Sequence, residues 1–299
     1  MKVFLQYNKE DWIVDRMALE FQSRWPNYIS NNLESSDIIW SWSPTPLNHN
    51  RIPIVTTVHH IDATKYNSSF YKAVDSGTSH YVTFCDKTKS AMESYPEFTK
   101  SIKVLPYWVN TNIWSPMCKQ TSRITLGIPL TKYVIGSFQR DTEGSDLISP
   151  KLSKGPDRFC DYVEKLQSLR KDIHVLLGGW RRQYVINRLT EKGIPFTYLE
   201  KPPIDRVNQM YNSCDLYVVG SRCEGGPQSI LECAATKTPI VSTDVGIASE
   251  ILSPSCIFNI DKHTYFPNEA DVAHAYTMVS KRSLHLDLGH VNYLKSLTK

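Results

Sequence analysis

Residues 215–232 read DLYVVGSRCEGGPQSILE, and this stretch decides the fold class. After Asp215 it begins with an apolar, β-rich run of the length expected for a buried strand. Gly225 and Gly226 follow, and glycine lets a backbone approach a ligand closely. Pro227 suits the first position of a helix, because proline lacks only an N–H that would be unpaired there. The stretch therefore predicts a strand, a glycine loop and a helix.

The start of this predicted helix is a candidate anion site. Free N–H groups in the first turn of a helix attract phosphate groups. Glu224 precedes the helix, and Gln228 and Glu232 lie four residues apart on one of its faces. Two carboxylates beside a phosphate site make chemical sense if they accept hydrogen bonds from hydroxyl groups, which a nucleotide sugar has on its ribose and its transferred sugar. A solvated helix face is the alternative for these glutamates taken alone.

The same alternation extends over the whole chain. Apolar, strand-like runs occur at 2–7, 37–42, 52–58, 80–85, 102–105, 133–138, 173–178, 215–219, 239–242 and 256–260. Helix-like segments occur at 12–24, 86–95 with Asp86 as N-cap, 156–169, 181–192, 204–213, 227–236 and 268–281. Alternating elements predict parallel sheets, whose ligands bind beyond the carboxyl ends of the strands. We expect an α/β protein with an N-terminal domain (1–115), a linker (116–130), a C-terminal domain (131–285) and a candidate crossover helix (286–299).

Length and composition agree with two ordinary globular domains. The chain has 299 residues, and its 34 basic and 30 acidic residues give a net charge of +4, so charge alone does not indicate nucleic-acid binding. The seven cysteines contain no C-x-x-C pair, which argues against a structural zinc or a disulfide framework. With no signal-peptide pattern and no apolar run of membrane-spanning length, we expect a cytoplasmic protein without a transmembrane segment.

Residues 211–251 resemble the donor-site core of the retaining GT-B enzymes called "glycosyl transferases group 1". YNSCD at 211–215 matches the family's Y-x-x-x-D strand, and SRCEGG at 221–226 matches its S-x-x-E-G loop. ECAATKTPIV at 232–241 matches E-A-x-A-x-G-x-P-V-V, and VGIASEI at 245–251 matches a G-G-x-x-E-I-like turn. The sequence differs from the family pattern at residues 226 and 227, where it has Gly-Pro and the family usually has Phe-Gly.

The resemblance implies two Rossmann-like domains whose parallel sheets face each other across a cleft. It implies that Glu224 contacts the transferred sugar and that Glu232 binds the ribose hydroxyls. The residues implied to bind the diphosphate and sugar are Gly225, Gly226, Pro227, Gln228 and Ser229. Gly179, in GGW at 178–180, resembles the G-x-G turn at the floor of the nucleotide pocket. Residues 199–203 stand where the family's backbone meets the base.

A second group of implied donor residues follows the strand-like run at 133–138. In the family an Arg and a Lys there grip the diphosphate, which assigns these roles to Arg140 and Lys154. An inserted loop, 141–146, separates them, and solvated surface side chains are the alternative. For Arg181 and Arg182 we expect a solvated helix start rather than phosphate contacts.

The N-terminal half carries weaker resemblances. TTVHH at 56–60 resembles the family's T-x-H element, in which the His lies beside the transferred sugar, so His59 is the candidate and His60 the second choice. KVLPYWVNTNIWSP at 103–116 resembles the V-I-P-N-G-V-D-x-x-x-F-x-P junction that precedes the linker. YNKEDW at 7–12 replaces the family's Gly-Gly loop.

These features predict transfer of a sugar from a nucleotide-diphosphate donor to an acceptor hydroxyl with retention of configuration. The chain lacks the D-x-D loop by which many transferases hold a metal, so we expect neither a metal nor a further cofactor. A saccharide or lipid-linked glycan is favoured as acceptor, and a hydroxylated nucleic-acid base stays open because WSWSP at 40–44 is rich in tryptophan. A sugar-nucleotide epimerase and a non-catalytic sugar-nucleotide-binding subunit are further alternatives.

Overall fold

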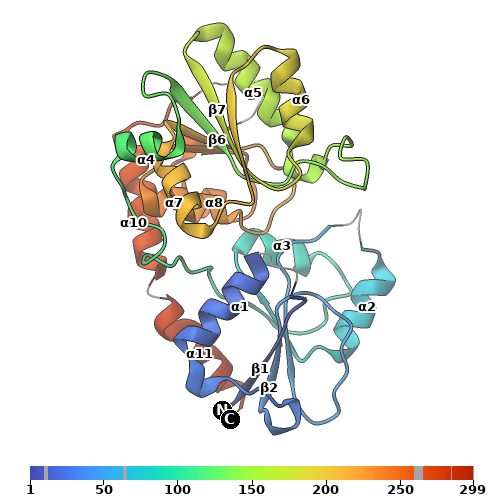
Figure 1. Cartoon of the computed structure of the whole chain (residues 1–299). Helices are drawn as coiled ribbons and strands as arrows, with labels where there is room; N and C mark the ends of the chain where they lie inside the picture. Colours follow the sequence, from blue (N-terminus) through green and yellow to red (C-terminus); the bar gives the residue numbers. More distant parts are fainter. Residues whose placement is uncertain (10–12, 63–65, 259–264, 284, 299) are drawn as a thin grey trace. The chain divides into compact units, whose positions relative to one another are not determined.

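The structure, a computed structural model, describes residues 1–9, 13–62, 66–258, 265–283 and 285–298. The chain divides into two compact units, one formed by Met1–Trp108 with Leu284–Lys299 and the other by Val109–Ser283. Each contains one five-stranded parallel sheet flanked by helices (Figure 1). The predicted α/β class with two Rossmann-like halves is confirmed. Within the described ranges, none of the helices combines the length and apolar content needed to cross a lipid bilayer.

The first unit has its strands in sequence order. They are β1 (Val3–Gln6), β2 (Ile38–Ser41), β3 (Ile54–Thr57), β4 (His80–Thr83) and β5 (Ile102–Val104). Its helices are α1 (Ile13–Arg24), α2 (Ser68–Gly77), α3 (Asp86–Glu93) and α11 (His285–Ser296). The five strand-like runs predicted for this half all form strands.

Aromatic side chains from distant parts of the sequence form the core of the first unit. Trp40 of β2 packs edge-on against Phe21 of α1, with ring centroids 5.0 Å apart, and stacks on Trp42 at 4.4 Å. Trp108 contacts both Phe21 and His290 of α11. These contacts explain why the C-terminal helix groups with the first unit. Trp40 and Trp42 are completely buried, so the tryptophan-rich segment belongs to the core and gives no support to a nucleic-acid acceptor.

The sheet of the second unit is wound in both directions from its middle strand. Its order is β10 (Ile240–Ser242), β9 (Leu216–Val219), β6 (Tyr133–Ser137), β7 (Ile173–Gly179) and β8 (Phe196–Glu200). Its helices are α4 (Lys119–Leu126), α5 (Pro156–Leu169), α6 (Gln183–Glu191), α7 (Ile204–Ser213), α8 (Gln228–Thr236), α9 (Ala248–Ile251) and α10 (Glu269–Ser283). The strand order reverses between β6 and β9, and ligands of open α/β sheets bind at such a switch point.

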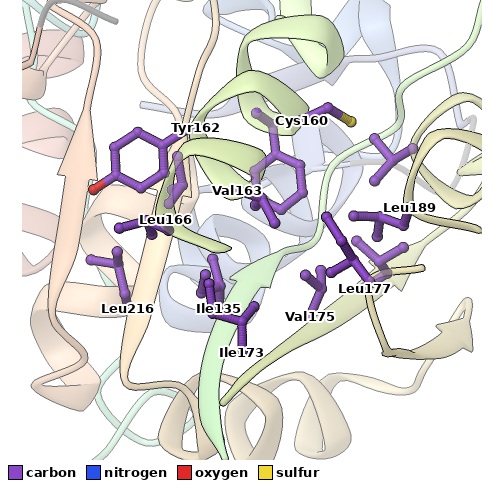
Figure 2. Packing of buried hydrophobic residues seen from close by; sticks show 14 of the residues in the cluster. Ile135, Cys160, Tyr162, Val163, Leu166, Ile173, Val175, Leu177, Leu189 and Leu216 are labelled. Carbon is purple, nitrogen blue, oxygen red and sulfur yellow. The ribbon is translucent and has the colours of Figure 1, made fainter. Parts of the chain in front are cut away.

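Alternate residues of these strands fill two hydrophobic layers. Ile135, Val175 and Leu177 point to the face covered by α5 and α6, where Figure 2 shows them beneath Val163 and Leu189. The neighbouring residues Val134 and Leu176 lie on the other face, in a cluster with Met210 of α7 and the adjoining Cys214. Both faces of the sheet are therefore buried, as expected for parallel strands.

Several predicted elements need correction. The run 256–260 was expected to be a strand, but Ile257 makes only an isolated parallel bridge to Ser242 after a short 3-10 turn, and 259 and 260 lie outside the described residues. The predicted linker 116–130 contains α4, whose buried Arg123 pairs with Asp215 of the second unit. Strand β8 and helix α2 were not predicted. Cys85 rather than Asp86 caps α3, and α8 begins one residue after Pro227.

Candidate functional site

Three loops meet at the carboxyl edge of the second sheet, and two of them touch through their backbones. Gly155, which ends the loop after β6, has a φ of +62°, and a Cβ added to it would lie 1.9 Å from the carbonyl oxygen of Gly220 after β9. Glycine is therefore required at position 155 for two reasons, its left-handed conformation and the lack of space. The backbone N–H groups of Arg222 and Cys223 both donate to the carbonyl of Ser153, at 2.8 and 3.2 Å.

The loop after β10 packs against the same residues. Gly246 has a φ of +48°, and a Cβ there would come within 2.3 Å of the carbonyl oxygen of Gly225. The Thr243 hydroxyl donates to the carbonyl of Ser221 at 2.6 Å. The predicted glycine loop is thus held from both sides, at the switch point of the sheet.

Lys154 and Glu224, predicted separately, contact each other in this loop cluster. Lys154 Nζ lies 2.5 Å from Glu224 Oε1, and the two side chains are 29% and 10% exposed. The Ser221 hydroxyl also donates to Glu224 Oε1, at 3.3 Å. Gln139 holds the main chain at this point by donating to the carbonyl of Lys154 at 2.7 Å. The ammonium assigned to the diphosphate is therefore neutralised by the carboxylate assigned to the sugar.

The inserted loop after Arg140 closes on itself. Glu143 N donates to Ser149 O at 2.9 Å and Lys151 N to Asp141 O at 2.8 Å, so the chain returns to its starting point before it reaches Lys154. Arg140 donates through Nε to the carbonyl of Thr142 and lies with its guanidinium 5.7 Å from the ring of Trp180. Its pKa is lowered, chiefly by burial and also by the charge of Arg181.

Arg182 corrects the prediction of a solvated helix start. It is completely buried and pairs through Nε with Asp141 Oδ2 at 3.0 Å. Its guanidinium also donates to the carbonyl of Gly178 at 2.7 Å and to the Ser137 hydroxyl at 3.1 Å, which ties the ends of β6 and β7 together. Burial raises the pKa of Asp141 even though Arg182 opposes that shift. The sequence offered no signal for this pair.

The first turn of α8 faces the loop cluster. Its N-cap, Pro227, has no side-chain group that can accept a hydrogen bond, so the N–H groups of this turn receive no cap from it. Gln228 and Ser229 begin the helix, as predicted within one residue. Gly225 and Gly226 precede it in the loop. An uncapped helix start of this kind attracts negative charge.

Glu232, one turn further along α8, is only 5% exposed. Its Oε2 accepts a hydrogen bond of 2.6 Å from the hydroxyl of Tyr211, the tyrosine of the Y-x-x-x-D motif. Burial, with a smaller contribution from the Glu232 charge, raises the pKa of Tyr211 well above its usual value. Sequence reasoning identified both residues but missed that they bind each other.

Gly179 ends β7 with a φ of +93°, and its carbonyl accepts from the Tyr198 hydroxyl at 3.0 Å. A Cβ at this position would lie 3.0 Å from the carbonyl oxygen of Phe138, so the turn also needs a glycine. The following residue, Trp180, is exposed at the carboxyl edge. The turn predicted to form the floor of the nucleotide pocket thus lies on the same edge as Lys154 and Glu224.

His59 belongs to the first unit and uses both ring nitrogens within it. Nε2 lies 2.7 Å from the carbonyl oxygen of Trp42, which can only accept, so Nε2 carries the proton. Nδ1 then accepts from the Tyr107 hydroxyl, also at 2.7 Å. Burial lowers the pKa of His59 to about 4, although the Trp42 carbonyl opposes the shift, and the charge of His60 lowers it further. The ring is neutral near pH 7.

A cavity lies elsewhere in the second unit. It encloses about 550 Å³ between α10 and the turn that leads into β10, and is lined by residues such as Lys237, Pro239 and Tyr276. That turn precedes a strand, so the cavity is at the amino edge of the sheet, opposite the loop cluster. Across the described part of the chain, no three His, Cys, Asp or Glu side chains come together as a set of metal ligands.

Comparison with known proteins finds similarity to glycosyltransferases, chiefly in the second unit. Residues 147–277 match the family model described as "Glycosyl transferases group 1". The lipopolysaccharide core biosynthesis mannosyltransferase LpsB of Rhizobium meliloti (strain 1021) is 27% identical over 145 residues, which cover 46% of this chain and 39% of LpsB. The putative teichuronic acid biosynthesis glycosyltransferase TuaC of Bacillus subtilis (strain 168) is 25% identical over 211 residues, 67% of this chain and 49% of TuaC. The matches span less than half of either relative.

Solved structures resemble the chain over nearly its whole length. Anabaena HepE, crystallised in complex with UDP and glucose, aligns with a TM-score of 0.74 at 14% identity, covering 98% of this chain and 99% of HepE. Sucrose-phosphate synthase from Thermosynechococcus elongatus aligns with a TM-score of 0.62 at 12% identity, over 94% of this chain and 75% of that one. The chain therefore has the GT-B fold, and its second unit matches the group 1 glycosyltransferase model over the residues that include Lys154, Glu224 and Glu232.

Proposed function

We propose that this protein is a glycosyltransferase that moves a sugar from a nucleotide-diphosphate donor to an acceptor hydroxyl. The observation that carries the proposal is the Lys154–Glu224 pair at the switch point of the second sheet, between two glycine loops and beside the uncapped start of α8. A cation and a helix start suit a diphosphate, and a carboxylate suits sugar hydroxyls. The family match over 147–277 and the UDP complex of HepE support a nucleotide sugar as the donor.

Donor binding would exchange the partners of this pair. The diphosphate takes the place of Glu224 beside Lys154, and Glu224 becomes free to accept hydrogen bonds from the hydroxyls of the transferred sugar. As the bond from the anomeric carbon to the diphosphate oxygen breaks, its electron pair stays on the diphosphate, and Lys154 and the α8 start stabilise the growing charge. The acceptor oxygen bonds to the same face of the anomeric carbon, and its proton passes to the diphosphate.

This mechanism includes retention of configuration and independence of metal ions as parts of the proposal. Neither a protein nucleophile nor a metal is needed, because protein groups neutralise the leaving diphosphate. Arg140 contributes charge at the same edge, and Glu232, which also accepts a hydrogen bond from Tyr211, is assigned to the ribose hydroxyls. His59 is neutral near pH 7, so it supplies no charge in the proposed reaction.

A saccharide or lipid-linked glycan is the proposed acceptor. The two relatives are named for lipopolysaccharide core and teichuronic acid biosynthesis, which supports a glycan acceptor. Burial of Trp40 and Trp42 removes the observation that favoured a nucleic-acid base. All seven cysteines are free thiols, which is consistent with a reducing compartment, so a cytoplasmic location is proposed as well.

The test is to incubate the protein with UDP- and GDP-sugars in EDTA and to follow nucleoside diphosphate release by chromatography and the first-formed anomer of the free sugar by NMR. We expect release from at least one α-configured donor, with the α-anomer formed first. Formation of the β-anomer first would contradict retention, and activity that requires added Mn²⁺ would contradict metal independence. Isomerised sugar nucleotide without diphosphate release would replace the proposal by an epimerase. The same assay is applied to Lys154→Ala. Its control is Lys171→Ala, because Lys171 is an exposed lysine just before β7, at the amino edge of the sheet.

A further inference from the structure

An exposed tryptophan surrounded by cations lies on the carboxyl edge, on the β7 and β8 side of the switch point. Trp180 is 40% exposed and directly follows β7. The guanidinium carbons of Arg140 and Arg181 lie 5.7 and 5.2 Å from its ring centroid, and Lys201 Nζ lies 4.9 Å from it. We call these four residues the Trp180 platform. The platform therefore combines an accessible aromatic surface with three positive charges at one place on the carboxyl edge.

The protein offsets the charge of the platform only in part, because Glu143 acts on Arg140 and Asp146 on Arg181 without forming an ion pair with them. Among the described residues, no carboxylate lies within ion-pair distance of the three cations, whereas Lys154 is paired. Arg140 donates to a main-chain carbonyl, and Arg181 donates through Nη2 to the Glu143 carbonyl at 3.3 Å. Arg181 Nε is buried and has no hydrogen-bond partner. A buried donor without a partner and three unpaired positive charges indicate an anionic ligand.

The backbone holds two of the cations in place at an energetic cost. Arg181 has a φ of +60° and Lys201 a φ of +44°, conformations that side-chain-bearing residues seldom adopt. The Arg181 carbonyl accepts from the Asp141 N–H at 3.1 Å and the Thr142 hydroxyl at 3.3 Å, and Lys201 N–H donates to Gly179 O at 3.3 Å. Strained conformations that are fixed from several sides gather at ligand-binding sites.

We propose that Trp180 is the stacking platform for the nucleobase of the donor, and that its three cations attract the phosphates. This rests on the proposed function and specifies how the nucleotide is bound. Neighbouring strands lie about 4.8 Å apart, so the platform at β7 and β8 is roughly 10 Å along the sheet from the β6–β9 switch point. A ribose and diphosphate can bridge that separation, with the diphosphate at Lys154 and the base on the indole.

The platform has a consequence for donor selectivity. Stacking uses the face of a base, and every nucleobase has such a face. A site that binds mainly through an indole therefore tolerates both a pyrimidine and a purine. We expect UDP and GDP to depend on Trp180 to a similar degree, whereas pyrophosphate, which has no base, does not depend on it.

Calorimetric titration of UDP, GDP and pyrophosphate into wild type, Trp180→Ala and Trp180→Phe tests the stacking. Trp25→Ala is the matched control, because Trp25 of the first unit also has an arginine over its ring, Arg24 at 5.6 Å. We expect Trp180→Ala to weaken UDP and GDP about tenfold, to leave pyrophosphate unchanged, and Trp180→Phe to recover part of the loss. Trp25→Ala should change none of the three.

Two results would overturn the stacking role. One is wild-type affinity of Trp180→Ala for both nucleotides. The other is an equal loss for pyrophosphate, which would mean that Trp180 supports the loop and not the base. If wild type binds pyrophosphate but no nucleotide, the platform is wrong while an anion site stands. If wild type binds neither UDP, GDP nor pyrophosphate, both the Trp180 platform and the proposed function are wrong.

The cations are tested separately with Arg181→Gln and Lys201→Gln. Lys237→Gln is their control, because Lys237 also has a positive φ, +58°, and lies over an aromatic ring, Tyr276 at 4.5 Å, but at the amino edge. We expect the two platform variants to weaken both UDP and pyrophosphate and to reduce the salt dependence of binding, since each removes a charge that meets phosphate. Unchanged affinity and salt dependence in both would exclude the cations from the site.

Discussion

Lys154 of the loop after β6 and Glu224 of the loop after β9 form an ion pair of 2.5 Å across the switch point of the second sheet. In the proposed mechanism both residues bind the donor and must therefore change partners. In the proposed mechanism the ammonium stabilises a charge that grows as the glycosidic bond breaks, so it contributes more to the transition state than to the ground state.

Lys154→Ala is expected to lower turnover by roughly a hundredfold or more, while the melting temperature changes little. Lys154→Arg should recover only part of the rate, because a planar guanidinium does not replace an ammonium at the same reach. Steady-state kinetics of both variants, with Lys171→Ala as control, provide the measurement. Near-normal turnover of Lys154→Ala at unchanged stability would assign the diphosphate to another residue, and Arg181 would be the next candidate.

Gly155→Ala is expected to destabilise the second unit by more than its backbone conformation alone explains. An added Cβ would meet the Gly220 carbonyl oxygen at 1.9 Å. Gly193→Ala is the matched control, because Gly193 has the same φ of +62° with no atom within 4 Å of an added Cβ. Urea unfolding should show a cost of about 1–2 kcal/mol for Gly193→Ala and at least about 2 kcal/mol more for Gly155→Ala. Equal costs would mean that the two loops are not held in contact.

Glu232→Ala and Tyr211→Phe separate ligand binding from stability at the α8 carboxylate. Glu232→Ala leaves the buried Tyr211 hydroxyl without its acceptor, and should cost about 1–3 kcal/mol of unfolding free energy as well as nucleoside diphosphate affinity. Tyr211→Phe removes the same hydrogen bond but keeps the carboxylate, so affinity should be largely retained. Unfolding curves and calorimetry on both variants decide the matter. Affinity that stays normal in Glu232→Ala would remove this residue from the ribose site.

His59 is expected to make the first unit less stable at mildly acidic pH. Its pKa of about 4 in the folded protein lies below the value of 6.5 for an unfolded chain, so the unfolded state binds more protons between these values. Stability is therefore fully present above about pH 6.5 and is lost as the pH falls toward 4. Between pH 7.5 and 5 the loss is about 2 kcal/mol.

Comparison of wild type with His59→Gln isolates this effect from other groups, such as His174, whose pKa burial also lowers. Urea unfolding at both pH values should show a smaller pH dependence for the variant. An identical dependence in the two proteins would mean that the His59 ring accepts a proton readily in the folded state.

The regular alternation of apolar runs and helical segments was enough to predict most strands and the α/β class. Elements without that pattern were missed. Strand β8 is only half buried, and the fully buried residues of α4 are the polar Ser122 and Arg123. Gly179, which leaves no room for a side chain, could be identified from the sequence because it lies in the G-x-G-like turn.

The pairs that side chains form within the site could not be predicted from the sequence. Arg181 and Arg182 are adjacent and identical in type, yet one is partly exposed beside Trp180 and the other is buried against Asp141. Arg181 has a positive φ, and its carbonyl accepts hydrogen bonds from Asp141 and Thr142, about forty positions away in the sequence. Likewise, the sequence predicted Lys154 and Glu224 as ligand-binding residues without indicating that they bind each other.

The exchange of partners by Lys154 is tested most directly by titrating UDP and GDP into wild type, Lys154→Ala and Glu224→Gln by calorimetry. Because these nucleotides have no transferred sugar, Glu224 acts on them only as the competitor for Lys154. We predict that wild type binds at least one of them, that Lys154→Ala binds it tenfold or more weakly, and that Glu224→Gln binds it more tightly than wild type. Loss of affinity in both variants, or no effect in either, would contradict the exchange.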